Sequence, residues 1–199
     1  MKLDHLQWPQ KGWGYLPATQ EIFDALNEVK LEYNPSFVLE IGYLMGHSTT
    51  YMLETFDADI ISISPEVDVG PAAIKAGDWI STEERISMYV KMKEIYGERW
   101  EWIRGRTQDL RSKLIHHYKD QFDMCFVDGN HSFKNAYYDV ETCSMLEIPV
   151  ILVDNMNTPD VSIAVQRQGD YILEKTFKYE STFKGKTTVI DLCVFELDK

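Results

Sequence analysis

Three apolar segments of this 199-residue chain each end in a carboxylate. Their sequences are F-V-L-E at 37–40, M-C-F-V-D at 124–128 and V-I-L-V-D at 150–154. A short, continuous apolar segment is typical of a strand that is buried on both faces, as in a parallel sheet. A carboxylate is costly inside such a strand, so we expect each acid to lie where its strand emerges. Because open α/β sheets bind ligands at the carboxyl ends of their strands, the three acids predict one site assembled from distant parts of the sequence.

Strand and helix patterns alternate along most of the chain. The expected strands lie at 37–41, 60–63, 100–103, 122–127 and 149–153, and two β-rich segments follow at 171–183 and 187–195. The alternation predicts a parallel sheet, and the last two segments predict an antiparallel hairpin. We therefore predict an α/β fold in one domain over residues 1–199. It has a seven-stranded, mostly parallel sheet with an antiparallel C-terminal hairpin, helices on both faces and an N-terminal arm at 1–17.

One helix is expected between the second and third strands. A capping-box pattern, Ser81 with Glu84, marks its start, and Gly97 marks its end. Its buried face is predicted from apolar spacing to consist of Ile86, Tyr89, Val90 and Ile95. Met88 and Met92 are expected to belong to the core rather than to a functional site.

The net charge limits the partners of the chain. With 20 basic and 32 acidic residues the charge is −12, which argues against binding to nucleic acid or to an anionic membrane surface. It is compatible with a cationic ligand or a metal ion. The polar start and the absence of a long apolar segment predict no secretory signal and no membrane span, so we expect a reduced, cytoplasmic protein. The sequence leaves a homodimer open.

The first glycine-containing turn follows the strand at 37–41. Residues 40–48 read E-I-G-Y-L-M-G-H-S, which is neither a G-x-G-x-x-G dinucleotide pattern nor a phosphate-binding loop. An ordinary strand-to-helix turn explains the pattern about as well as a site does. The pattern E-x-G-x-x-x-G-x-S resembles motif I of class I S-adenosylmethionine-dependent methyltransferases. That resemblance implies that Glu40, Gly42, Gly46 and Ser48 hold the cofactor.

A second segment, G-R-T-Q-D at 105–109, follows the third strand. It resembles the G-x-S-Q-D segment of catechol O-methyltransferases, which implies that Thr107 and Gln108 contact the adenine ring. From the residues alone, Thr107 is equally an N-cap of the next helix.

A third segment, D-G-N-H-S-F at 128–133, resembles small-molecule O-methyltransferases of the catechol and macrocin type. In that family an acid after strand four and an Asp-Asn pair after strand five bind one magnesium ion, and Asp128, Asp154 and Asn155 occupy these positions. Two carboxylates and an amide supply the oxygen ligands that Mg²⁺ or a similar cation prefers. Asp128 is also a candidate catalytic and cofactor-binding residue.

His131 is the candidate general base. Its unperturbed pKa suits proton removal from a hydroxyl group near neutral pH. The catechol enzymes place a lysine at this offset from the metal-binding aspartate, so the resemblance implies a base here. The alternative is that His131 caps the following helix or holds the loop.

The second strand departs from the family pattern. Class I methyltransferases usually end it with an acid that binds the ribose hydroxyls, and Ser64 stands there in this chain. Ser64 is a candidate cofactor-binding residue that can form one hydrogen bond but not the bidentate contact, so Glu66 or Asp68 from the following loop is the candidate substitute. The alternative is that the cofactor binds weakly or is a different one. The loop at 65–80 and the arm with Trp8 and Trp13 are candidates for a substrate lid.

The resemblance implies a Rossmann-like methyltransferase fold and an S-adenosylmethionine-dependent, metal-dependent O-methyltransferase that acts on a small hydroxylated molecule. The first alternative is a binding protein with the same fold that has lost catalysis, which Ser64 would be consistent with. The second is a nicotinamide-dependent oxidoreductase, against which the missing G-x-G-x-x-G pattern counts.

Overall fold

The structure of the protein, a computed structural model, describes residues 19–65, 82–183 and 186–198. Trp8, Trp13, Glu66, Asp68 and Ser81, named above as candidates for a lid, a ribose contact and a helix cap, lie outside the described residues.

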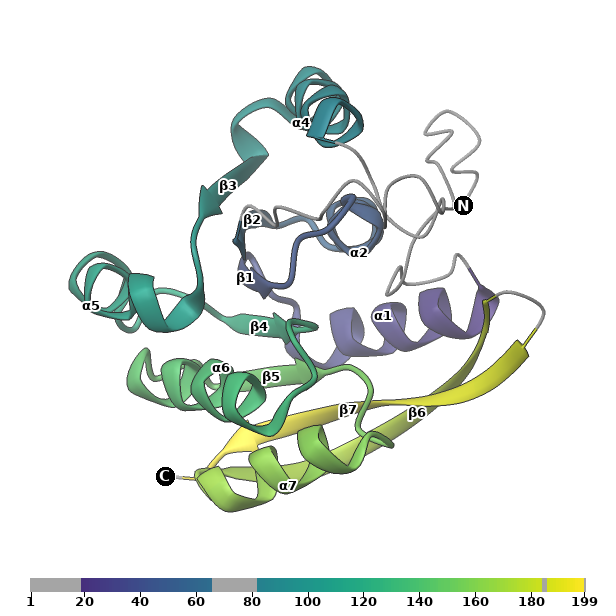
Figure 1. The fold of residues 1–199 in the computed structure, drawn as a ribbon, viewed down its shortest axis with the longest axis vertical. Helices are drawn as coiled ribbons and strands as arrows, with labels where there is room; N and C mark the ends of the chain where they lie inside the picture. The colour runs from purple at the N-terminus through teal and green to yellow at the C-terminus, as the bar shows by residue number, and fades with distance from the viewer. Residues whose placement is uncertain (1–18, 66–81, 184–185, 199) are drawn as a thin grey trace.

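A seven-stranded sheet forms the centre of the molecule (Figure 1). Its strands are β1 (Phe37–Ile41), β2 (Asp59–Ser64), β3 (Trp100–Arg104), β4 (Met124–Val127), β5 (Val150–Val153), β6 (Tyr171–Phe183) and β7 (Lys186–Leu197). The strands are ordered β3-β2-β1-β4-β5-β7-β6. The first five are parallel, whereas β7 is antiparallel to both β5 and β6. The predicted parallel sheet with an antiparallel hairpin at its edge is confirmed.

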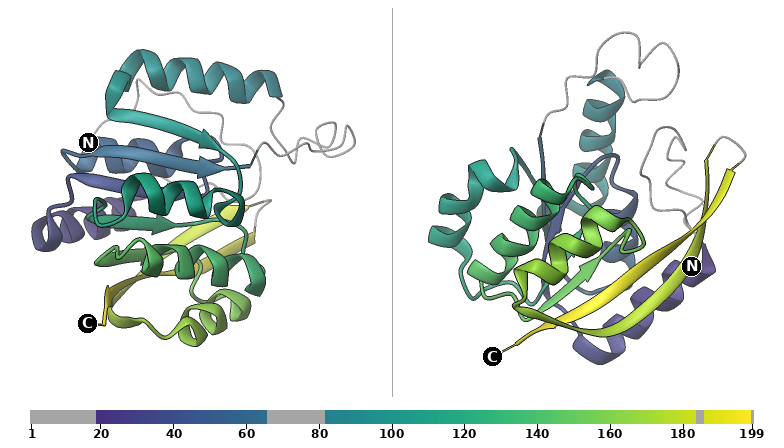
Figure 2. Two further views of the ribbon diagram at one scale, coloured as in Figure 1. Left: turned by 90° about the vertical axis from the view of Figure 1, so that its left-hand side faces the viewer. Right: turned by 60° about the horizontal axis from the view of Figure 1, so that its bottom comes forward.

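Helices cover both faces of this sheet (Figures 1 and 2). They are α1 (Gln20–Tyr33), α2 (His47–Thr55), α4 (Thr82–Tyr96), α5 (Thr107–Tyr118), α6 (Phe133–Met145) and α7 (Pro159–Gln168). α1, α2 and α4 share one core cluster with Val38 and Phe126, and α5, α6 and α7 share another with Leu39 and Cys125. Successive strand residues thus face opposite cores, as expected for strands buried on both faces. In the described part of the chain, no helix is both long and apolar enough to cross a membrane.

The predicted buried face of α4 is wrong for three of its four residues, and only Tyr89 packs against the core as expected. Ile86, Val90 and Ile95 are 51%, 47% and 41% exposed, whereas Met88, Met92 and Tyr96 are buried. Two apolar stripes run along this helix, and spacing alone does not decide which one faces the core. Packing against α2 decides it, since the Met92 sulfur accepts a hydrogen bond from the Thr50 hydroxyl of that helix at 3.4 Å.

The hairpin extends beyond the rest of the sheet. β7 pairs with β5 over residues 193–196, whereas β6 and β7 pair along 171–183 and 186–197. The outer half of the hairpin therefore runs as a two-stranded ribbon past the carboxyl end of β5 (Figure 1). This extension brings Tyr179 of β6 to the end of β5, where Asp154 lies.

Candidate active site

Glu40 lies inside β1, not beyond its end, so the expectation for this acid is wrong. Its side chain is fully buried, and three hydroxyl groups compensate for the lost water. Ser48 donates to Oε1 at 2.5 Å, while Thr49 and Ser62 donate to Oε2 at 2.6 and 2.5 Å. Burial raises the pKa of Glu40, and the three hydrogen bonds act in the opposite direction.

These contacts place the Glu40 side chain between β2 and the start of α2, which follows the glycine turn. Ser48 and Thr49 belong to the first turn of α2, so the carboxylate fixes the start of this helix to β1 and β2. Because Glu40 is fully buried, a ligand could contact it directly only if a neighbouring group moved. The cofactor-binding role expected for Glu40 therefore stays a prediction.

The glycine turn touches the loop that follows β4. Gly42 has φ +120°, and a β-carbon built on it would lie 1.9 Å from the carbonyl oxygen of Asp128. Its amide donates to the carbonyl of Ile63 at 2.9 Å. Gly46, with φ +80°, precedes α2 as its N-cap residue. Gly42 thus permits the cofactor-type turn and the Asp128 loop to lie in direct contact.

Asp128 directly follows β4 and pairs with His131. The histidine Nε2 lies 3.4 Å from Asp128 Oδ1, and the two side chains are 36% and 9% exposed. The hydrogen bond with Asp128 raises the pKa of His131, while burial raises the pKa of Asp128. A partly exposed imidazole beside a carboxylate can accept a proton from a ligand.

Asp154 directly follows β5 and is 4% exposed. The Tyr179 hydroxyl donates to its Oδ1 and Oδ2 at 2.9 and 3.0 Å, and the Asn155 amide nitrogen donates to Oδ2 at 2.5 Å. Burial, followed by the nearby charge of Asp128, raises the pKa of Asp154 to about 8. Asn155 has φ +58°, a conformation that asparagine tolerates better than most residues.

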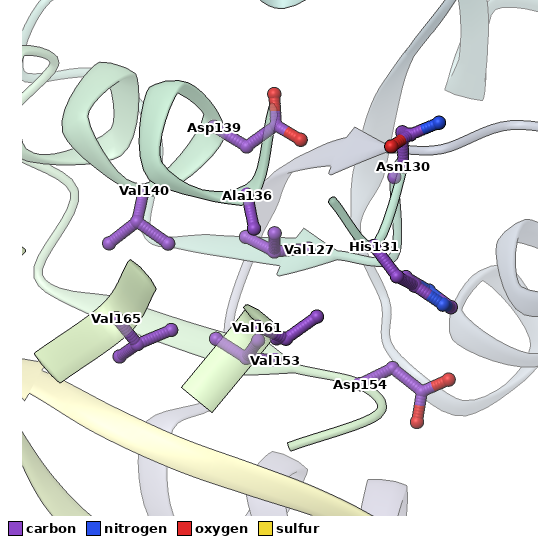
Figure 3. A pocket seen from close by; sticks show the side chains of 11 residues that line it. Val127, Asn130, His131, Ala136, Asp139, Val140, Val153, Asp154, Val161 and Val165 are labelled. Carbon is purple, nitrogen blue, oxygen red and sulfur yellow. The ribbon is translucent and has the colours of Figure 1, made fainter. Parts of the chain in front are cut away.

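His131 and Asp154 meet at one end of a small cavity (Figure 3). The walls of this cavity come from β4, β5, α6 and α7 and include Val127, Val140, Val153, Val161 and Val165. The polar groups are thus held by rigid elements over an apolar interior. The expectation that an acid lies where its strand emerges is confirmed for Asp128 and Asp154.

Ser64, at the end of β2, is hydrogen-bonded to a neighbouring tryptophan. Its hydroxyl accepts a hydrogen bond from Trp102 Nε1 at 3.1 Å, and the residue is 6% exposed. The guanidinium groups of Arg85 and Arg104 lie 5.4 and 4.9 Å from the centre of the Trp102 ring. Trp102 therefore holds the serine at the position where the resemblance predicts an acid.

The segment after β3 leads into α5. Arg106 is the N-cap residue of this helix and Thr107 its first residue, so the alternative interpretation of Thr107 as the N-cap is wrong. Thr107 is buried and hydrogen-bonds to Asp139 of α6, whereas Gln108 is partly exposed.

Comparison with known proteins decides the family. Residues 39–149, more than half of the chain, match a family model described as a methyltransferase domain. The chain belongs to this methyltransferase family. The predicted family resemblance and the Rossmann-like methyltransferase fold are thereby confirmed.

Individual methyltransferases agree with this assignment. Catechol O-methyltransferase of Mus musculus is 29% identical over 150 residues, which are 71% of this chain and 49% of the mouse protein, so the chain spans about half of that relative. Two solved structures share the fold. The O-methyltransferase from Bacillus cereus in complex with SAH has a TM-score of 0.62 at 16% identity, with 91% and 84% of the two chains covered. TomG from Streptomyces achromogenes, in complex with SAM, has a TM-score of 0.60 at 17% identity, with 92% and 82% covered.

The residues at the ends of β4 and β5 have side chains that suit a hard divalent cation. The described residues contain no cluster of three or more His, Cys, Asp or Glu side chains suited to a metal. Asp128, Asp154 and Asn155 instead offer two carboxylates and an amide oxygen, which suit Mg²⁺. Both carboxylates are largely buried and each has a raised pKa, so a cation between them would offset unfavourable negative charge.

Sequence reasoning missed two polar residues of this part of the methyltransferase fold. Tyr179 reaches Asp154 only because of the hairpin register, and a tyrosine in a β-rich segment carries no signal of such a contact. Asp139 interrupts the buried face of α6 between Ala136 and Val140, and an acid at a core position was the available signal.

Proposed function

We propose that this protein is an S-adenosylmethionine-dependent, divalent-metal-dependent O-methyltransferase that acts on a small hydroxylated molecule. One observation carries the proposal. Asp128 and Asp154, at the ends of neighbouring parallel strands, lie beside Asn155 and His131, and Gly42 of the cofactor-type turn touches the Asp128 loop. A donor methyl group and an acceptor hydroxyl could thus be held side by side.

The cofactor would lie along the carboxyl ends of β1 to β3. The turn from Gly42 to Ser48 would pass its methionine part, and Thr107 and Gln108 would meet the adenine ring. Glu40 would act through Ser48 and Thr49, which it holds by hydrogen bonds. Ser64 could offer the ribose at most a single hydroxyl contact, and Glu66 remains a candidate for the second.

Asp128, Asp154 and Asn155 would hold the cation. S-adenosylmethionine supplies an electrophilic methyl group, and a bound cation lowers the pKa of an acceptor hydroxyl. His131 Nε2, 3.4 Å from Asp128 Oδ1, would donate to this carboxylate, so Nδ1 would receive the hydroxyl proton and Asp128 would stabilise the resulting imidazolium. Tyr179 and Asn155 hold the Asp154 carboxylate by donating hydrogen bonds to it, so its orientation is set before any ligand arrives.

Methyl transfer to a catechol and to sugar hydroxyls tests the proposal, with Mg²⁺ and with a chelator. We expect transfer that requires Mg²⁺ and that falls by about 100-fold or more in Asp154→Asn, which removes a ligand charge while keeping the shape. Transfer that is unaffected by chelator would contradict metal dependence.

The second candidate function is a methyltransferase-fold binding protein without catalysis. Ser64 favours it, because the ribose-binding acid is missing and the serine is engaged by Trp102. This candidate predicts S-adenosylmethionine binding that is insensitive to Asp154→Ala, with no methyl transfer to any acceptor tested.

A further inference from the structure

Asp139 is a buried acid that the proposed reaction leaves without a role. It lies on α6 with 5% of its surface exposed, and its carboxylate points away from the valines of the cavity (Figure 3). Burial raises the pKa of Asp139 to about 7. A carboxylate at such a position is costly unless specific contacts compensate for the lost water.

Two segments of the candidate site meet at this carboxylate. Gly129, which follows Asp128, lies so close that a β-carbon built on it would be 2.7 Å from Asp139 Oδ2. Thr107, which precedes Gln108 and is 4% exposed, hydrogen-bonds to Asp139 through its side chain. Asp139 therefore connects the first turn of α5 to the loop after β4.

A cation one turn further along α5 adds to this contact. The charge of Arg111 opposes the rise in the pKa of Asp139. Arg111 is itself held on α6 by Glu141 at 2.7 Å and by the Thr142 hydroxyl at 3.1 Å. Other titratable groups of the described residues lie near Asp139. The Cys125 thiol of β4 stays neutral because burial raises its pKa well above the ordinary value, and His131 and Asp154 line the same cavity as Asp139.

We propose that Asp139 is a positioning residue for the cofactor: it fixes the first turn of α5, and with it Gln108, against the loop that carries Asp128. The inference rests on the proposed adenine-binding role of Thr107 and Gln108. When Asp139 is protonated, it loses its charge toward Arg111 and much of its attraction for the Thr107 hydroxyl. Cofactor affinity then depends on the ionisation of a residue that does not touch the cofactor.

Calorimetric titration with S-adenosylhomocysteine, from roughly pH 5.5 to 8.5, tests this inference. Wild-type affinity should fall about five- to tenfold as the pH decreases through about 7, a change that corresponds to one weakened charge-assisted hydrogen bond. Asp139→Asn should have the low wild-type affinity at every pH. Glu141→Gln is the matched control, because this acid contacts Arg111 but not Thr107, and it should keep the wild-type profile. A pH dependence that persists in Asp139→Asn overturns the proposal.

Variants of Thr107 keep the test valid if Asp139→Asn folds poorly. Thr107→Val removes the hydroxyl and should lower the affinity for S-adenosylhomocysteine, whereas Thr107→Ser should restore most of it. The double variant Asp139→Asn with Thr107→Val should bind no worse than the weaker single variant. A merely structural role predicts lower melting temperatures with equal affinities for Thr107→Val and Thr107→Ser, and that result contradicts the inference.

Gln108→Ala separates this inference from the proposed function. If Gln108→Ala binds S-adenosylhomocysteine as tightly as the wild type does, the assigned adenine site is wrong and the inference falls with it. If Gln108→Ala weakens binding while the Asp139 and Thr107 variants do not, the proposed function stands and the positioning role alone is overturned.

Discussion

The carbonyl oxygen of Asp128 occupies the space that any side chain on Gly42 would need. This contact links two turns that are 86 positions apart in the sequence. It gives Gly42 two separate reasons to be glycine, a positive φ and the close approach of a backbone. One residue thus joins the expected cofactor turn to the expected metal loop.

Gly42→Ala should destabilise the fold by about 3 kcal/mol, because the added carbon forces the two turns apart and strains the backbone. Gly97→Ala is the matched control. Its φ is also positive, at +56°, but nothing lies within 4 Å of the added carbon, so the cost should be about 1 kcal/mol. Urea unfolding at equilibrium measures both, and equal losses would contradict the proposed steric conflict.

Asp139 should reduce stability as the pH rises. Its pKa rises from an ordinary 3.8 to about 7 in the folded protein, so the folded state binds this proton more tightly than the unfolded state does. The free energy of unfolding should therefore fall between about pH 4 and pH 7 through this group. Asp139→Asn should lack this contribution and should gain stability relative to the wild type as the pH rises. Urea unfolding between about pH 4 and pH 7 measures the difference in the free energy of unfolding between Asp139→Asn and the wild type. A difference that does not change with pH would refute the raised pKa of Asp139.

At the scale of elements, α4 shows the limit of apolar spacing as a guide. Ile86 and Val90 lie four positions apart, as do Met88 and Met92. Both stripes satisfy the helical period, and the folded structure buries the methionine stripe. Which stripe is buried depends on what the helix packs against, here the turn at Gly46 and the first turns of α2.

Met92→Ala should lower the free energy of unfolding by about 2–5 kcal/mol, because the side chain is fully buried and its removal leaves a cavity. Ile86→Ala, in the exposed stripe of the same helix, should change it by about 0.5 kcal/mol or less. Thermal or urea unfolding distinguishes the two variants. The reverse order would show that the stripes are assigned to the wrong faces.

The long hairpin connects β6 to the candidate metal site through Tyr179. Tyr179→Phe removes the hydroxyl that donates to both Asp154 oxygens, so we expect Mg²⁺ affinity to fall by about tenfold in calorimetric titration. Tyr171→Phe is the matched control, since its hydroxyl donates to the Ile148 carbonyl at the other end of β6. Equal effects of the two variants on Mg²⁺ affinity would argue against a specific role for Tyr179.

Local patterns predicted the elements well, and tertiary contacts decided the rest. The strand after residue 36 and the 171–183 segment could be recognised because continuous apolar or β-rich sequence determines a strand locally. The burial of Glu40 could not be predicted from the local sequence, because its hydrogen-bond partner Ser62 comes from the neighbouring β2. Tyr179 escaped prediction for the same reason, since its contact depends on the register of a long hairpin.

For the whole molecule, the strand order places the candidate site. The order β3-β2-β1-β4-β5 reverses direction between β1 and β4, and open α/β sheets bind ligands at such a reversal. Gly42 follows β1 and Asp128 follows β4, so their contact marks this point. The cofactor sub-site would lie on the β1 to β3 side and the metal sub-site on the β4 and β5 side.

This arrangement assigns the acids at the strand ends to different tasks. Glu40 organises the start of α2 from inside the sheet, and Asp128 with Asp154 forms the candidate cation site. Ser64, held by Trp102, stands where the resemblance predicts a ribose-binding acid. Cofactor binding is therefore the claim on which the whole account depends.

Calorimetric titration of the protein with S-adenosylmethionine, with Mg²⁺ and with a chelator, tests that claim most directly. The account predicts saturable binding of one cofactor per chain under both conditions, because the proposed cofactor contacts come from the turns after β1 and β3 and not from the cation. The absence of a binding signal under both conditions would contradict it.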